Sequence, residues 1–114
     1  MSDGKLVRDL IPEIITASGR QPEIRHIRGD DLINALAAKL CEEANEVAGA
    51  LPDTNKLIEE LADLREVMSA LMSLTGITER DVIETAEAKA HARGRFEAGV
   101  WLVTGSPART EPRA

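Results

Sequence analysis

The sequence is almost without aromatic residues, with no Tyr, one Phe and one Trp in 114 residues. Its core must therefore be aliphatic. The single cysteine, Cys41, excludes an internal disulfide and a zinc site built from several thiolates. No apolar run reaches membrane-spanning length and the N-terminus lacks a signal-peptide pattern, so we expect a cytoplasmic protein with no membrane partner.

The charge balance is acidic, with a formal net charge of -6 and no basic stripe. A general nucleic-acid partner is therefore not expected, although local basic residues could hold a phosphorylated small molecule. The hydrophobic fraction of 43% favours a globular fold over disorder. The length fits one domain over residues 1–103, followed by a Pro-, Gly-, Ser- and Arg-rich disordered tail over 104–114.

Helix-start and helix-stop residues predict a mainly helical chain. Pro12 suits a first helical turn, and Gly19 and Gly76 suit C-terminal caps. Thr78 with Asp81 forms a capping-box pattern. The helices expected from these signals cover residues 12–18, from 30 or 31 to 50, 55–75 and 78–94.

Two segments could be strands, and the first of them alternates apolar and polar residues. Residues 22–28 fit a short strand or an extended arm, and residues 98–103 fit a second short strand. The predicted fold class is all-α: an antiparallel helical hairpin or bundle with a third helix, room for these two strands, and an oligomeric assembly.

Two acidic clusters repeat one spacing on the two longest predicted helices. They read Glu-Glu-Ala-Asn-Glu over residues 42–46 and Glu-Glu-Leu-Ala-Asp over residues 59–63. Each places a carboxylate three residues after another. A short loop separates the helices, so they are expected to pack as an antiparallel hairpin.

Helical wheels place equivalent acids of the two clusters in similar positions. At about 100° per residue, Glu43 and Glu60 fall on the shoulders of the apolar stripes. Glu46 and Asp63 lie one turn further on the same sides, and Glu42 faces water. Packing the two shoulders together would bring Glu43, Glu46, Glu60 and Asp63 into one partly buried space.

Four converging carboxylates repel one another, and a hard divalent cation such as Mg²⁺ or Mn²⁺ would offset that repulsion. Acids at this spacing are also common on solvated helix faces. The matched phase of the two clusters favours a metal site, but from the residues alone both interpretations stay open.

Basic residues supply candidate partners for these acids or for an anionic ligand. Lys89 and Arg93 fall near the apolar side of the last predicted helix. They could neutralise the acids, hold substrate phosphates, or extend past the core to solvent. Lys5 and Arg8 near the N-terminus are similar candidates.

The chain resembles the MazG-like, all-α nucleoside triphosphate pyrophosphatase superfamily. Its nearest branch is that of small, single-domain proteins similar to phosphoribosyl-ATP pyrophosphohydrolase. The resemblance rests on the two acidic motifs, E-E-x-x-E and E-x-x-D, together with "KLVRDLIPEII" and "KAHARGRFEAGVWL". It covers about residues 4 to 103.

The resemblance implies Mg²⁺-dependent hydrolysis between the α and β phosphates of a nucleotide, with Mn²⁺ as a substitute ion. The products would be a nucleoside monophosphate and pyrophosphate, in the house-cleaning of non-canonical nucleotides. It also implies a homodimer or homotetramer. The implied metal ligands are Glu43, Glu46, Glu60 and Asp63, with Glu42 as a further catalytic acid; the implied phosphate contacts are Lys5, Arg8, Lys89 and Arg93.

Three alternatives remain open at this point. The substrate could be phosphoribosyl-ATP in histidine biosynthesis, or the chain could be a non-catalytic helical binding or regulatory module, or a plain structural hairpin dimer. Three positions depart from the family pattern: Leu10, Asn45 and Arg95. These departures bear on the choice of substrate and on the rate, because none of them removes an implied metal ligand.

Overall fold

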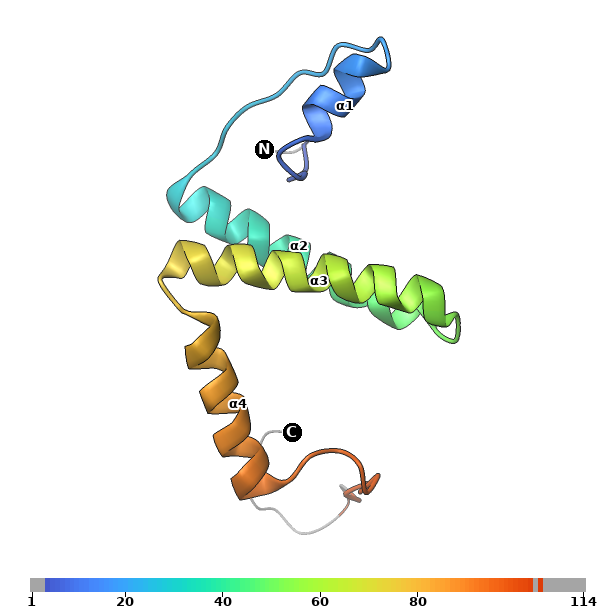
Figure 1. Cartoon of the computed structure of the whole chain (residues 1–114), viewed down its shortest axis with the longest axis vertical. Coiled ribbons are helices and arrows are strands. Elements are labelled where there is room, and N and C mark those ends of the chain that lie inside the picture. Colours follow the sequence, from blue (N-terminus) through green and yellow to red (C-terminus); the bar gives the residue numbers. More distant parts are fainter. Residues whose placement is uncertain (1–3, 104, 106–114) are drawn as a thin grey trace.

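The computed structural model describes residues 4–103 and Gly105, and these residues form four α-helices and no strand (Figure 1). The predicted all-α fold is confirmed. The expected tail at 104–114 lies outside the described residues apart from Gly105. In chain order the helices are α1 (Ile11–Ala17), α2 (Gly29–Ala50), α3 (Thr54–Thr75) and α4 (Glu79–Arg93).

Neither of the two possible strands forms in the described part of the chain. Residues 22–28 run as an extended arm between α1 and α2, which was the other interpretation of their alternating pattern. Residues 98–103 begin in a turn and continue without regular structure. A strand needs a neighbouring strand to pair with its backbone N–H and C=O groups, and the described residues contain no strand.

Helices α2 and α3 form an antiparallel hairpin, which is the one extensive helix–helix contact in the described residues. Each has 22 residues. The buried apolar side chains of this contact are Leu36 and Ala50 from α2 and Val67 from α3. As the lack of aromatic residues requires, this small core is aliphatic.

Local signals set the ends of the long helices. The Asp53 carboxylate accepts a hydrogen bond from the Lys56 N–H at the start of α3, and Gly76 ends α3 with a φ of 74°. That left-handed conformation suits glycine because it has no Cβ. At the start of α2, Asp30 and Asp31 lie in the first turn, so the predicted cap position was wrong by a few residues; Arg28 occupies it without a side-chain hydrogen bond.

The corner between α3 and α4 is held by side chains as well as by Gly76. The predicted capping box is confirmed: the Asp81 N–H donates to the Thr78 hydroxyl at 3.0 Å, and the Thr78 N–H donates to the Asp81 carboxylate at 3.0 Å. The pKa of the Asp81 carboxyl is lowered, first by the hydrogen bond from the Thr78 backbone and then by hydrogen bonding of the carboxyl with the Thr78 side chain. Arg65 of α3 also pairs with Glu79 of α4 at 3.2 Å.

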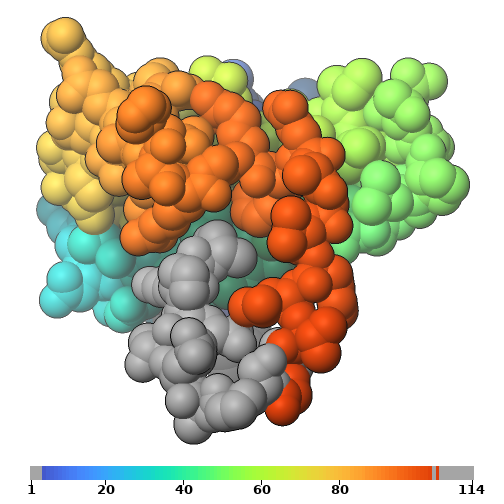
Figure 2. Space-filling model, turned by 90° about the horizontal axis from the view of Figure 1, so that it is seen from below, coloured from blue at the N-terminus to red at the C-terminus, as the bar shows by residue number. Residues whose placement is uncertain are grey.

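The chain is open rather than compact. Its radius of gyration is 18.7 Å, against about 13 Å for a compact domain of this size. Both α1 and α4 stand away from the hairpin, and Figure 2 looks toward α4 with the two ends of the hairpin on either side. Within residues 4–103, no helix combines the length and apolar character that crossing a bilayer requires.

Helix α4 differs most from its sequence-based description. Its apolar side was expected to face a core, but Val82 and Ile83 remain 39% and 54% exposed. Further along the chain, Phe96 and Trp101 are 82% and 89% exposed. The helix itself was correctly predicted, but its residues are weakly segregated into apolar and polar sides, and none of them is buried in the described single chain.

Candidate metal centre

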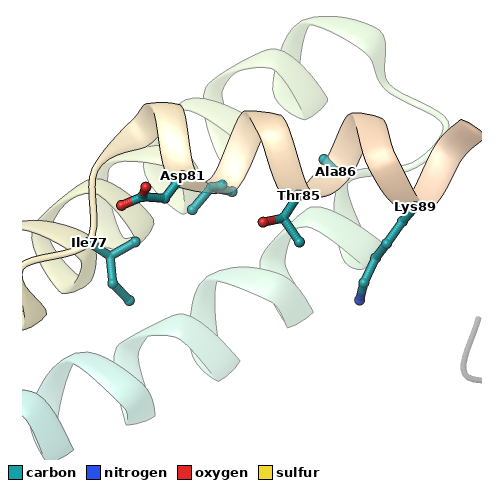
Figure 3. Close-up of a pocket in the computed structure, with 6 residues that line it drawn as sticks. Ile77, Asp81, Thr85, Ala86 and Lys89 are labelled. Atoms are coloured by element: carbon teal, nitrogen blue, oxygen red, sulfur yellow. The ribbon is translucent and has the colours of Figure 1, made fainter.

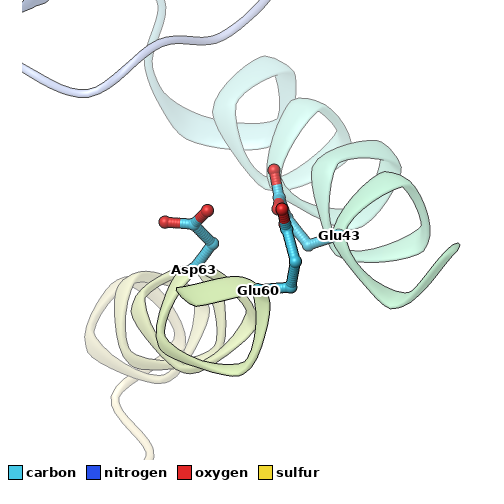
Figure 4. A group of neighbouring side chains, drawn as sticks. All are labelled: Glu43, Glu60 and Asp63. Atoms are coloured by element: carbon cyan, nitrogen blue, oxygen red, sulfur yellow. The ribbon is translucent and has the colours of Figure 1, made fainter. Parts of the chain in front are cut away.

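Three carboxylates meet where α2 and α3 face each other (Figure 4). Glu43 comes from α2, and Glu60 and Asp63 come from α3. One oxygen from each lies within 4.8 Å of an oxygen of the other two. Glu43 is buried and the other two are half-buried, so the group lies at the edge of the hairpin's apolar contact.

The helical geometry explains why these acids converge. Glu43 and Glu60 each occupy the shoulder of an apolar stripe, so packing of the stripes carries both to the rim of the contact. Asp63 is three residues after Glu60 and therefore lies on the same side of α3, about one turn away. Three of the four predicted ligands thus share one site.

Glu46 and Glu42 lie outside this group of three. Glu46 is exposed, but it is near enough to raise the pKa of Glu60 by repulsion. Glu42 is also exposed, as the wheel predicted, and its carboxylate lies 3.5 Å from the Lys39 ammonium. Neither acid contributes an oxygen to the group of three in this structure.

Lys39 is a neighbour of the site that sequence reasoning missed. Its ammonium lies 3.7 Å from the Glu43 carboxylate, and its side chain is only 21% exposed. The spacing could have revealed it, because residues four apart on a helix face each other. Lys39 therefore gives the buried Glu43 a counter-ion.

Arg8, from the segment before α1, contacts the site. Its Nη2 atom donates to Asp63 Oδ1 at 2.7 Å, across 55 residues of sequence. Sequence reasoning placed Arg8 among the phosphate contacts. In the structure the guanidinium contacts a carboxylate of the acid cluster instead.

Glu60 is the acid of the group that lacks a counter-ion of its own: among the described side chains, no Lys or Arg pairs with it. Partial burial raises the pKa of Glu60 above its ordinary value of 4.5, and repulsion by Glu46, Asp63 and Glu43 raises it further. Lys56 acts weakly in the opposite direction. Glu60 is therefore the acid of the cluster whose pKa is raised by repulsion from the surrounding carboxylates.

The donor set fits a hard divalent cation. All three groups offer carboxylate oxygens, which Mg²⁺ and Mn²⁺ prefer. Oxygens that share an octahedral Mg²⁺ at about 2.1 Å lie roughly 3 to 4 Å apart. The spacing of up to 4.8 Å here needs only small side-chain rotations to reach that range.

The other predicted phosphate contacts are not gathered at this site. Lys89 lines an open groove on α4 together with Ile77, Thr85 and other residues of its own segment (Figure 3). In the described part of the chain, Lys5, Lys89 and Arg93 form no hydrogen bond or ion pair with the acids. Their predicted role stays a prediction.

Comparison with known proteins gives one partial relative. A protein of Mycolicibacterium smegmatis (strain ATCC 700084 / mc(2)155), described as an uncharacterized protein, is 54% identical over 46 residues. Those residues are 40% of this chain and 47% of that protein, so the chain spans about half the length of the relative it matches. No solved structure matches the chain.

The family comparison covers far more of the chain. Residues 7–90, most of the four-helix region with both acidic clusters, match the family described as phosphoribosyl-ATP pyrophosphohydrolase, or PRA-PH. This family is part of the MazG-like all-α pyrophosphatase superfamily, so the resemblance seen in the sequence is confirmed. The chain belongs to the phosphoribosyl-ATP pyrophosphohydrolase family.

Proposed function

We propose that the protein is a divalent-cation-dependent nucleotide pyrophosphohydrolase. It cleaves the bond between the α and β phosphates of a nucleoside triphosphate to give a monophosphate and pyrophosphate. The observation that carries the proposal is the convergence of Glu43, Glu60 and Asp63 within 4.8 Å at the rim of the hairpin, in a chain whose family hydrolyses such bonds.

The acid cluster would hold Mg²⁺ or Mn²⁺, which lowers the pKa of a bound water and offsets phosphate charge. Glu43, Glu60 and Asp63 would be its ligands, with Glu46 completing the set from the next turn of α2. Water would attack the α phosphorus in line. The bond from this phosphorus to the oxygen bridging the α and β phosphates would break, and pyrophosphate would leave with the electron pair. Glu42 and Glu46 are the two candidates for the carboxylate that takes the proton of the water.

Cationic side chains would offset the charge that develops on the transferred group. Lys89 and Arg93 are the proposed phosphate contacts on α4, with Lys5 and Arg8 at the N-terminus. The site as described has Arg8 and Lys39 beside the acids. Contact from Lys89 and Arg93 would require an approach by α4 of this chain or of another copy.

A second copy of the chain is part of this proposal. Only three apolar side chains among the described residues are buried, and α4 leaves its apolar side open. On α3, Leu61 and Met68 belong to the predicted apolar stripe yet are 46% and 41% exposed. Self-association as a homodimer or homotetramer would cover these surfaces and would enlarge the small core that the single chain forms.

Phosphoribosyl-ATP is the second candidate substrate, and the description of the matched family favours it. The same cluster of acids would serve both reactions, because the same phosphoanhydride bond is broken. The acids therefore cannot discriminate between the two, and the substrate must be identified by assay.

The test is pyrophosphate release with Mg²⁺ across normal, deaminated and oxidised nucleoside triphosphates and phosphoribosyl-ATP. Wild-type protein is compared with Glu60→Gln and with Glu66→Gln, a matched change at an exposed position of α3. We expect turnover that Glu60→Gln abolishes and Glu66→Gln leaves intact. A folded wild-type protein that turns over none of these substrates would overturn the proposal in favour of a binding module.

A further inference from the structure

The Arg8–Asp63 ion pair ties the N-terminal segment to the acid cluster. Within the described residues, it is the one hydrogen bond or ion pair that joins residues 4–27 to the α2–α3 hairpin. The two side chains are 58% and 44% exposed. The contact therefore lies at the open edge of the cluster, where an ion entering from solvent would approach.

The N-terminal segment has little else to hold it in place. Helix α1 has seven residues, each at least partly exposed, and its N-cap residue makes no side-chain hydrogen bond. A helix of this length is unstable unless something docks it. The extended arm of residues 20–28 separates it from α2 (Figure 1). The Arg8 contact is therefore the polar contact that places the segment against the hairpin.

A guanidinium and a divalent cation would compete for the Asp63 carboxylate. An arginine guanidinium is a fixed positive charge in proteins. That of Arg8 is 2.7 Å from Oδ1, so a cation on either Asp63 oxygen would face a positive charge a few ångströms away. Glu43 has Lys39 of its own helix at 3.7 Å, and among the described residues no Lys or Arg pairs with Glu60. Arg8 is consequently the charge that a cation meets at the α3 side of the cluster.

We propose that Arg8 is a built-in competitor of the cation. Without an ion, it occupies Asp63 and holds the N-terminal segment against the cluster. When a divalent cation binds, the guanidinium is displaced, the segment is released, and Arg8 becomes available to an anion beside the ion. This rests on the cation site of the proposed function and adds to it a coupling between ion binding and the N-terminal segment.

The first test measures Mn²⁺ binding without nucleotide, by the loss of the free-ion electron paramagnetic resonance signal. Arg8→Gln removes the competitor, and exposed ion pairs are worth about 0.2–1 kcal/mol, so we expect Mn²⁺ to bind about 1.4- to fivefold more tightly. Arg8→Lys keeps the charge and should stay close to wild type. Arg65→Gln is the matched control, because it breaks another exposed ion pair of α3, with Glu79.

The second test follows the segment itself by amide hydrogen exchange in residues 11–17. In the wild type, saturating Mn²⁺ should speed exchange in α1. In Arg8→Gln, exchange should already be fast and should not respond to the ion. A merely structural Arg8 would give fast exchange in the variant but no effect of Mn²⁺ on the wild type, which would overturn the proposal.

The outcomes separate this inference from the proposed function. If the wild type binds Mn²⁺ and Glu60→Gln does not, but Arg8→Gln binds it with unchanged or weaker affinity, the cation site stands and the competition is wrong. If wild-type protein binds no Mn²⁺, both fail together. If Mn²⁺ binds more tightly to Arg8→Gln and to Arg65→Gln by the same factor, the effect comes from the change in net charge. That result would also overturn the competition.

Discussion

Glu43 of α2 and Glu60 of α3 meet across the hairpin, and Glu43 is the member of this pair that has a cation at its side, Lys39 at 3.7 Å. The buried acid is thus compensated, whereas the half-buried acid carries a raised pKa. This asymmetry makes Glu60 the position at which a change of charge should have opposite effects on stability and on ion binding.

Replacing Glu60 by Gln should stabilise the ion-free protein and abolish its response to Mg²⁺. The substitution removes the repulsion from Asp63, Glu43 and Glu46, so the melting temperature without ions should rise. A ligand is lost at the same time, so hydrolysis should fall by at least about a hundredfold, more than the loss typical of residues that only support a ligand. Thermal melts with and without Mg²⁺ provide the check, and an unchanged gain on adding Mg²⁺ would contradict the assignment.

The pH dependence of stability should change sign when a divalent cation is added. Because the pKa of Glu60 in the folded state is above its ordinary 4.5, the folded protein keeps this proton to higher pH than the unfolded chain does. This group therefore lowers the stability of the ion-free protein as pH rises from 4.5 through the raised pKa.

Mg²⁺ binds the ionised carboxylate, so its stabilising effect should grow over the same pH window. Urea unfolding at several pH values, with Mg²⁺ or with a chelator, measures both trends. Glu60→Gln should lose this part of the pH dependence. If it keeps the wild-type dependence, the raised pKa belongs to another group.

Lys39→Gln should lower the free energy of unfolding without Mg²⁺, and it should lower it less when Mg²⁺ is bound. The change leaves the buried Glu43 without its counter-ion, at a cost between those of exposed and buried ion pairs, about 1 to 3 kcal/mol. A cation in the cluster would replace the lost charge. Chemical denaturation in Mg²⁺ and in chelator is the measurement, with Arg80→Gln as the control, because it removes the cation of an exposed ion pair on α4. An equal loss in both conditions would argue against a shared site.

Thr78→Ala should cost about 1 kcal/mol, because it removes the hydroxyl that caps α4. Circular dichroism during urea unfolding measures the loss. Thr85→Ala is the matched control within the same helix, at an exposed position. The capping box lowers the pKa of Asp81, so its contribution is present above the ordinary pKa of 3.8 and is lost as pH falls through the lowered value. A loss that is equal in both variants would show that the cap is not the cause.

Ile83→Glu should weaken self-association of the chain at least tenfold, if the open side of α4 is covered by a second copy. The substitution places a charge on the open side of α4, where Ile83 is 54% exposed in the single chain. Sedimentation velocity over a range of concentrations gives the association constants. Ala88→Glu adds the same charge to α4 at a position about 140° around the helix; it should have little effect, and a wild-type protein that stays monomeric would reject the second copy.

The hairpin and its acids were predictable because both depend on short-range rules. Helix periodicity and the caps at Asp53 and Gly76 are local, and the short loop leaves the antiparallel arrangement as the natural packing. Once the stripes pack, Glu43 and Glu60 must approach each other. These relations need no knowledge of distant parts of the chain.

The contacts that reasoning from sequence missed depend on long-range placement or on competing uses of one residue. The pairing of Arg8 with Asp63 spans 55 residues, and no local pattern encodes it. The extended segment at 22–28 shows that alternation alone does not make a strand when no partner is beside it. For α4, the helix was correctly predicted, but a helical pattern does not state which surface, if any, covers its apolar side chains.

Trp101 has a practical consequence for any spectroscopic study of this protein. It is the sole tryptophan, the chain has no tyrosine, and its side chain is 89% exposed. Intrinsic fluorescence therefore originates beyond α4, far along the chain from the hairpin, and its emission should be that of a solvated indole. Melting of α2 and α3 would leave this signal nearly unchanged, whereas a blue shift would report that something has covered the C-terminal segment.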